Sequence, residues 1–186
     1  MKQEKIHRAD KLLVAIDQTA SSDCAFETAL ELIRALNAEL TLVYVLNIFS
    51  SDSPSSPFVL AGSNLSEIDE KVQKDYGSKM AEFVGRYDAL LKEKQAAAKV
   101  VGATAQCIQP HGRPGSAICQ VASEHNVNLI VMGNRDRSTL KERVPGSVSN
   151  YIVHHAPCSV IIVHSDSQSQ SMASEQPSEF SLAGVV

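Results

Sequence analysis

The chain has 186 residues, of which 44% are hydrophobic, and a formal net charge of −4. This length is sufficient for one domain with a substantial core, and the mixed, mildly acidic charge without a basic face of interleaved aromatics argues against a nucleic-acid-binding protein. No apolar run approaches the ~20 residues that a membrane span needs, and the charged N-terminus leads into a short apolar run without a signal peptide, so we expect a cytoplasmic protein.

The first apolar run is typical of a strand in a parallel sheet. Leu12–Ile16 is continuously apolar and ends in Asp17, as expected for a strand buried on both faces. A helix should follow, with Ser21 or Ser22 as its N-cap and Asn37 as its left-handed stop. Its apolar stripe recurs with a helical period: Phe26, Ala29, Leu30, Ile33 and Leu36.

A second strand, a loop and a long helix are predicted next. Glu39–Leu46 is rich in β-branched and apolar residues, which favours a strand. Residues 49–64 are rich in Ser and Pro and lack periodic apolar positions, which indicates a loop. Residues 66–69 resemble a capping box before one long helix that contains Gly77 and Gly85. We expect its stripe to be core: Ile68, Val72, Tyr76, Met80, Phe83, Tyr87, Leu90 and Leu91.

Two more helices and three strands complete the predicted order. Ala103–Gln109 is the weakest strand pattern, and Pro114 suits the first position of the short helix that follows it. Val127–Met132 is the next buried strand. A helix is expected over Ser147–His155, ended by a proline, before a last strand over Ser159–Val163.

The alternation of strands and helices predicts an α/β fold: a five-stranded parallel, doubly wound, Rossmann-like sheet with helices on both faces. Residues 1–164 would form this domain, and residues 165–186 a mostly disordered tail rich in Ser and Gln. Ligands of such folds lie beyond the carboxyl ends of the strands, where the strand order reverses. If the first and fourth strands are neighbours, then Asp17, Val45 and Gly133 face one crevice.

The four cysteines are scattered, without a C-x-x-C pair. This spacing indicates small buried hydrophobic residues in a reducing compartment, with a redox role for one of them as the less favoured alternative. The residues are Cys24, Cys107, Cys119 and Cys158. The six histidines show no metal-binding spacing.

A possible anion site lies where the fourth strand ends and the last helix begins. Gly133 follows the strand and lets the backbone turn or approach a ligand closely. Gly146 and Ser147 open the helix, whose first backbone N–H groups and dipole favour a phosphate. The alternative is that Gly133 is only a turn residue and Ser147 an ordinary N-cap.

From Lys11 to Val163 the chain resembles the universal stress protein family. The resemblance rests on short segments that occur in the family's order: Val14-Ala15-Ile16-Asp17, Leu42-Val43-Tyr44-Val45, Gly112-Arg113-Pro114, Leu129-Ile130-Val131-Met132-Gly133, Gly146-Ser147-Val148 and Ala156-Pro157-Cys158-Ser159-Val160. It implies a five-stranded doubly wound domain, usually a homodimer, and many members bind ATP.

The resemblance also implies which residues meet the nucleotide. ATP-binding members carry Gly-x-x-Gly, nine residues, then Gly-Ser or Gly-Thr. Here the spacing holds, but Asp136 stands at the second glycine. By resemblance, Asp17 and the backbone near Val45 meet the adenosine part. The phosphates and ribose are lined by Met132, Gly133, Gly146, Ser147 and Val148.

Asp136 opposes a phosphate chain in the expected site. Two unit charges ~4 Å apart repel by about 4 kcal/mol at an effective dielectric of 20. A bridging Mg²⁺ would relieve the repulsion, as would pairing with a cation of the same connection. The available cations, which alternatively form a solvated loop face, are Arg135, Arg137, Lys141 and Arg143.

Three functions compete. We favour a non-enzymatic universal stress protein that binds ATP, with Mg²⁺ if needed, and acts on partners as a dimer paired through the edge strand Ser159–Val163. The alternative, suggested by Asp136, is an ATP-independent, chaperone-like dimer. An ATP hydrolase is disfavoured because only Asp136 or His111 offers a general base near the phosphate end.

Overall fold

The structure, a computed structural model, describes residues 10–50, 52–55, 70–134 and 147–165. Elements alternate as the sequence predicts. They are β1 (Lys11–Ala15), α1 (Ala20–Leu36), β2 (Glu39–Val43), α3 (Glu70–Val100), β3 (Ala105–Ile108), α4 (Pro114–Glu124), β4 (Leu129–Gly133), α5 (Ser147–His155) and β5 (Ser159–Val163). The predicted capping box at 66–69 and all but the first residue of the predicted tail at 165–186 lie outside the described residues.

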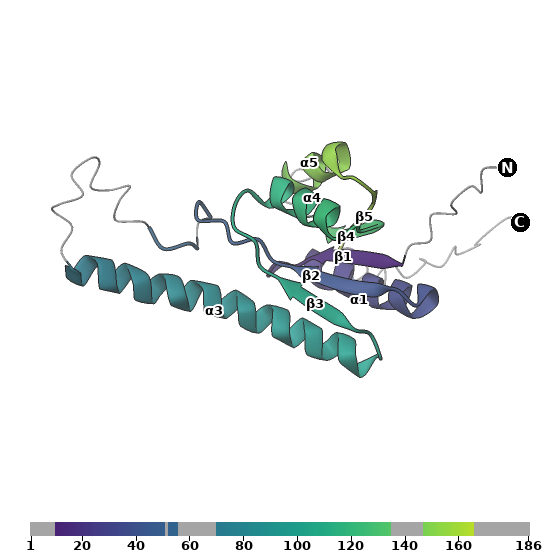
Figure 1. Ribbon diagram of the computed structural model, residues 1–186, viewed down its shortest axis with the longest axis horizontal. Coiled ribbons are helices and arrows are strands. Elements are labelled where there is room, and N and C mark those ends of the chain that lie inside the picture. The colour runs from purple at the N-terminus through teal and green to yellow at the C-terminus, as the bar shows by residue number, and fades with distance from the viewer. Residues whose placement is uncertain (1–9, 51, 56–69, 135–146, 166–186) are drawn as a thin grey trace, which may run out of the picture.

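The five strands form one sheet in the order β3-β2-β1-β4-β5, and every neighbouring pair is parallel (Figure 1). Leu13 of the central strand β1 pairs with Thr41 on one side and Ile130 on the other. The predicted fold class is therefore confirmed. So is the expected neighbourhood of the first and fourth strands, which puts the reversal of strand order between β1 and β4.

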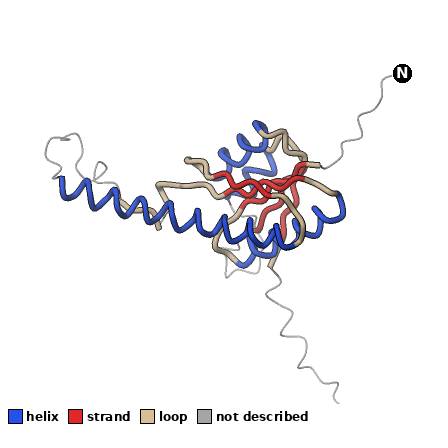
Figure 2. The backbone as a smooth tube through the Cα atoms, turned by 60° about the horizontal axis from the view of Figure 1, so that its bottom comes forward, coloured by secondary structure: helices blue, strands red, loops and turns tan. Residues whose placement is uncertain are grey.

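Helices cover both faces of the sheet (Figures 1 and 2). Leu12 and Val14 of β1 belong to the core beneath α1 and α3, which also contains Phe26 and Leu91. Leu13, between them in sequence, belongs to the core beneath α4 and α5. Continuous apolar strands are the expected consequence of a parallel sheet that is buried on both sides.

The N-cap of α1 differs from the prediction. Thr19, not Ser21 or Ser22, has the extended backbone of a cap, and its side chain accepts from the backbone N–H of Ser22. Ser21 and Ser22 already lie in the first helical turn, and both are buried. The predicted stop is confirmed, because Asn37 adopts the left-handed conformation at φ 52° and ψ 49°.

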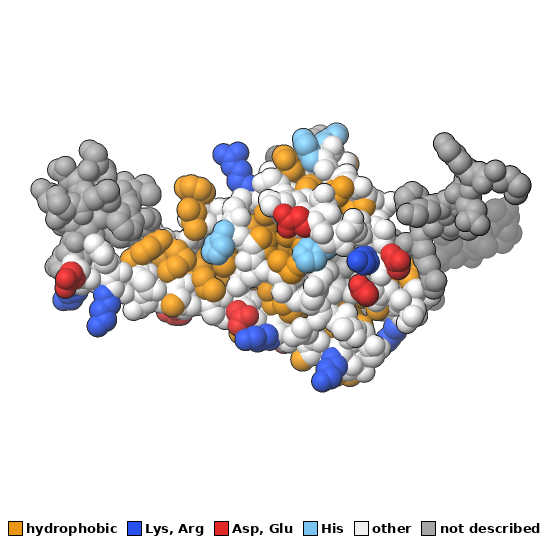
Figure 3. Space-filling view, viewed as in Figure 1, with side chains coloured by type: hydrophobic (Ala, Val, Ile, Leu, Met, Phe, Trp, Pro, Cys, Tyr) orange, Lys and Arg blue, Asp and Glu red, His pale blue; other side chains and the backbone are white. Residues whose placement is uncertain are grey.

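Helix α3 is one helix of 31 residues, as predicted, but its apolar stripe is buried only from Phe83 onward. The buried side chains are Phe83, Tyr87, Leu91 and Ala98, whereas Val72 is 47% exposed. A helix of this length spans about 46 Å, against about 17 Å for a five-residue strand. Its N-terminal half therefore extends past the sheet, and hydrophobic side chains gather over it on the surface in Figure 3.

All four cysteines are free and only partly buried, so the thiols are less enclosed than the sequence suggested. Burial raises the pKa of the Cys107, Cys119 and Cys158 thiols, which disfavours the reactive thiolate. Among the described helices, none has the length and apolar character needed to cross a membrane.

Candidate functional site

A cleft of about 630 Å³ lies at the carboxyl ends of β1, β2 and β4. The described members of the predicted site all line it, namely Asp17, Val45, Met132, Gly133, Ser147 and Val148. Arg135, Asp136 and Gly146, the remaining predicted members, lie outside the described residues. The fold therefore brings together residues that are up to 131 positions apart, from Asp17 to Val148.

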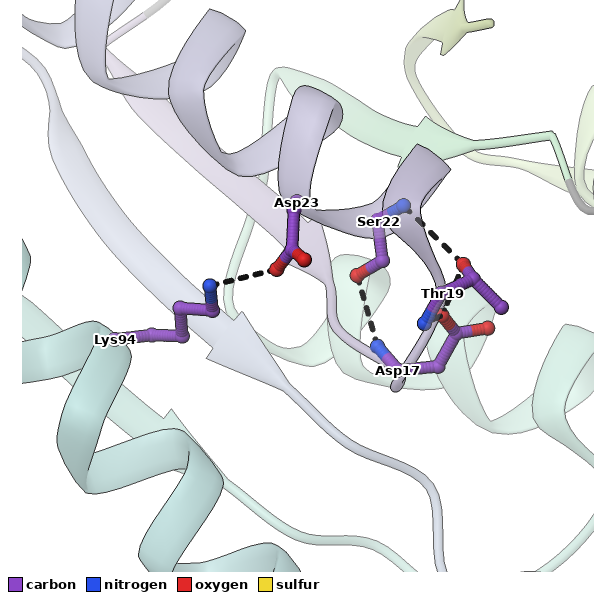
Figure 4. Close-up of polar contacts among 5 residues, drawn as sticks. All are labelled: Asp17, Thr19, Ser22, Asp23 and Lys94. Carbon is purple, nitrogen blue, oxygen red and sulfur yellow. Dashed lines mark hydrogen bonds and ion pairs between the residues drawn. The ribbon is translucent and has the colours of Figure 1, made fainter. Parts of the chain in front are cut away.

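Asp17 is held in one orientation by the start of α1 (Figure 4). Its Oδ1 accepts hydrogen bonds from the backbone N of Thr19 at 2.8 Å and from the Thr19 hydroxyl at 2.5 Å. Its own backbone N donates to the Ser22 hydroxyl at 2.9 Å. These contacts use otherwise unpaired groups at a helix start, and they fix a carboxylate in the wall of the cleft.

An ion pair next to this turn connects α1 to α3. Lys94 Nζ lies 2.7 Å from Asp23 Oδ1 (Figure 4). It also lies 5.1 Å from the ring centroid of Phe26. The Lys94 side chain is only 15% exposed, so this pair is better shielded than the surface pairs along α3. Helix α3 is thereby held against the first turn of α1.

Gly133 is required by close packing between β4 and α1. A Cβ at this position would lie 2.4 Å from the carbonyl carbon of Ser21 and 2.7 Å from the backbone N of Ser22. Gly133 is not one of the described residues with a positive φ, so its backbone conformation does not require a glycine. The glycine thus lets the end of the strand touch the helix backbone, a role that the sequence hypotheses of a turn or a ligand contact did not include.

Sequence reasoning missed Asn134, which links β4 to its neighbours. Its backbone N donates to the carbonyl of Val163 at 2.9 Å, and its Oδ1 accepts from the Ser149 hydroxyl at 3.3 Å. Asn134 and Ser149 are both 2% exposed. Its position as a polar residue directly after a buried strand could have indicated a structural role. The contacts of Asn134 hold the start of α5 at the cleft.

The opposite end of the cleft is aromatic. The rings of Tyr44 and Tyr87 stack with centroids 3.8 Å apart and planes 11° apart. The Tyr87 hydroxyl donates to the carboxylate of Asp52, in the loop after β2. Phe49 of the same loop also lines the cleft. Sequence reasoning placed Tyr87 only in the core stripe and gave Asp52 and Phe49 no role.

Burial and hydrogen bonding together shift the pKa values of Tyr44, Tyr87 and Asp52. Burial raises the pKa of Tyr44, and the hydrogen bond with Tyr87 raises it further. Burial also raises the pKa of Tyr87, and its bond to Asp52 adds to the shift. The same bond holds the pKa of Asp52 below its ordinary value. At neutral pH this end therefore presents two neutral phenols and one carboxylate.

The cleft thus has two chemically different ends. Hydroxyl groups and the start of α5 line one end through Thr19, Ser147 and Ser149. Aromatic rings line the other. Across the described residues, no group of three or more His, Cys, Asp or Glu side chains is placed to hold a metal ion. This arrangement suits a ligand with an anionic part and a flat apolar part.

Comparison with known proteins identifies the family. Residues 9–164 match the model of the universal stress protein family. The chain belongs to this family. It is 35% identical over 156 residues to the universal stress protein YxiE of Bacillus subtilis, an alignment that covers 83% of this chain and 98% of that relative.

Solved structures with the same fold include two family members. The universal stress protein UspA of Lactobacillus plantarum has a TM-score of 0.63 at 24% identity, over 84% of this chain and 98% of that chain. A family member from Arabidopsis thaliana, solved with AMP bound, has a TM-score of 0.55 at 20% identity, over 88% and 97%. At these identities the likeness establishes the fold.

Proposed function

We propose that this protein is a non-enzymatic, cytoplasmic stress-response protein that binds an adenine nucleotide, ATP in the first instance, in the cleft. The observation that carries the proposal is the cleft itself, because the fold gathers the described predicted residues at the reversal of strand order. Its volume of about 630 Å³ is within the range of small-molecule sites. The AMP bound to the Arabidopsis relative supports the same ligand class.

The polarity of the cleft sets the orientation of the nucleotide. Phosphates would lie at the first turn of α5, where Ser147 is exposed and backbone N–H groups lack helical partners. The base would lie between the end of β2 and the aromatic end, near Val45. Asp17 lies between these ends and is suited to accept from ribose hydroxyls.

Asp136 decides between this function and its alternative, an ATP-independent interaction dimer. Calorimetric titration of ATP with and without Mg²⁺ tests the choice, after release of any bound nucleotide by denaturation. We expect saturable binding that weakens without Mg²⁺, because the metal offsets the Asp136 carboxylate. Asp136→Gly should bind in both conditions and lose the dependence on Mg²⁺.

A matched pair of serine variants localises the binding. Ser147→Ala removes a hydroxyl from the proposed phosphate end and should weaken ATP binding. Ser78→Ala removes an exposed hydroxyl that bonds only within α3, to the carbonyl of Lys74, and should not. Absence of binding in wild type, with binding gained in Asp136→Gly, would favour the ATP-independent alternative. Absence in both proteins would reject nucleotide binding.

We also propose that the protein acts as a homodimer paired along β5. Ser159–Val163 is the last strand of the sheet, and four of its five residues are half-buried apolar side chains. Such an edge pairs readily with another chain. Light scattering should show a dimer for wild type and a monomer for Ile161→Glu, with circular dichroism to verify that the variant is folded. A wild-type monomer, or a dimer that survives the substitution, would reject this interface.

A further inference from the structure

The loop after β2 forms an ordered turn. Asn47 Oδ1 accepts from the backbone N of Phe49 at 3.0 Å, and the Asn47 carbonyl accepts from the backbone N of Ser50 at 3.0 Å. The Ser50 hydroxyl donates to the same carbonyl at 2.7 Å. Two residues on, Asp52 accepts from Tyr87 of α3. The turn is therefore fixed by its own hydrogen bonds and by a bond to a helix.

This turn holds an aromatic side chain at the mouth of the cleft. Phe49 lines the cleft, yet 82% of its surface is exposed. Within the described part of the chain it takes part in none of the ring pairs, whereas Tyr87 stacks on Tyr44 and meets Phe83 edge-on at 5.2 Å. A large apolar ring that is attached to a fixed backbone and left uncovered beside a cleft is suited to cover a flat ligand.

We propose that Phe49 is the stacking residue for the nucleobase and that it gives the cleft a preference for purines. This inference rests on the proposed nucleotide-binding function and specifies its base contact. The stacked Tyr44–Tyr87 pair closes the end of the cleft, and the free face of Phe49 covers the base from the mouth. A purine offers the larger surface to that ring, so purines should bind more tightly than pyrimidines.

A single tryptophan can report this contact, because the chain contains none. Phe49→Trp places an indole on the turn, and AMP should quench its fluorescence saturably. Val100→Trp is the matched control, since Val100 is 87% exposed at the last residue of α3 and does not line the cleft. AMP should leave its emission unchanged.

Affinity measurements with AMP and ribose 5-phosphate separate the contribution of the base to binding from that of the phosphate. For Phe49→Ala we expect AMP affinity to fall roughly 5- to 150-fold, the range for loss of one base–aromatic stack. The affinity for ribose 5-phosphate should be unchanged, and the preference for AMP over CMP should narrow. Phe49→Leu keeps apolar surface without a ring and should recover only part of the loss.

The possible outcomes distinguish the stacking role of Phe49 from the proposed nucleotide-binding function. If wild type binds AMP and Phe49→Ala binds it equally well, the stacking role is wrong and nucleotide binding stands. An equal loss for AMP and ribose 5-phosphate would show that the turn supports the site as a whole, and would also overturn the inference. If wild type binds neither AMP nor ATP, the proposed function and the stacking role are rejected together.

Discussion

Replacing Gly133 with alanine is expected to destabilise the fold and to displace the start of α1. The new Cβ would lie 2.4 Å from the Ser21 carbonyl carbon and 2.5 Å from its oxygen. It would have to move about 1 Å to reach ordinary contact at 3.4 Å. Because all three close neighbours are backbone atoms, no side-chain rotation can relieve the overlap.

The magnitude follows from the size of the required displacement. Overpacking a dense interior costs typically 1–3 kcal/mol, and a clash with backbone belongs at the upper end, about 3 kcal/mol. For a domain of this size, that loss lowers Tm by roughly 6–12 °C. The helix start that must move also orients Asp17 through Thr19, so nucleotide affinity should fall as well.

Chemical denaturation followed by circular dichroism measures the change. Gly77→Ala is the matched control, because a Cβ there meets nothing within 4 Å and the site is inside α3. It should stabilise the protein by about 0.5–1 kcal/mol through helix propensity. A Gly133→Ala protein within 0.5 kcal/mol of wild type would refute the packing role of Gly133.

Three further predictions concern contacts around the cleft and the helices beside it. Tyr87→Phe removes the bond to Asp52 and should cost about 1 kcal/mol at pH 7. Since that bond lowers the Asp52 pKa, its stabilisation is present above about pH 4 and is lost as the pH falls through the lowered pKa. The stabilities of the two proteins, measured by denaturation, should therefore converge as the pH falls below the lowered Asp52 pKa; a difference that stays constant with pH would contradict the linkage. Thr19→Ala removes the α1 cap and should cost about 1 kcal/mol, with Thr19→Ser recovering most of it in the same assay. Gly115→Ala places a Cβ 2.7 Å from the ring of Tyr151, a movable side chain, so it should destabilise less than Gly133→Ala, and Tyr151→Ala should relieve the clash in the double variant.

The architecture was predictable because it depends on patterns that are local in sequence. The buried strands are continuous apolar runs, and the predicted bounds of α5 and β5 match the structure. Their alternation with amphipathic helices leaves few topologies, so the neighbourhood of β1 and β4 also followed. The position of the cleft then followed from the rule for doubly wound sheets.

The predictions that were wrong or missing concern details that depend on tertiary contacts. Thr19, Ser21 and Ser22 all carry a hydroxyl that could cap α1. Thr19 is the cap in the structure, where its backbone N and its hydroxyl both donate to Asp17. The periodicity of α3 predicts an apolar face but not how much sheet there is to cover it, so Val72 was wrongly assigned to the core. No sequence signal joins Asp52 to Tyr87, which lie 35 positions apart.

The first turn of α1 supports both the centre and the aromatic end of the cleft. On one side, its cap Thr19 orients Asp17. On the other, Asp23 in that turn pairs with Lys94, which lies seven residues and therefore two turns after Tyr87 on the same face of α3. The pair thus holds α1 against the part of α3 that carries Tyr87, whose hydroxyl bonds to Asp52 in the same loop as Phe49. A shift of α1 should consequently disturb the Asp17 contact and the base end together, whereas a change confined to the loop after β2 should affect the base end alone.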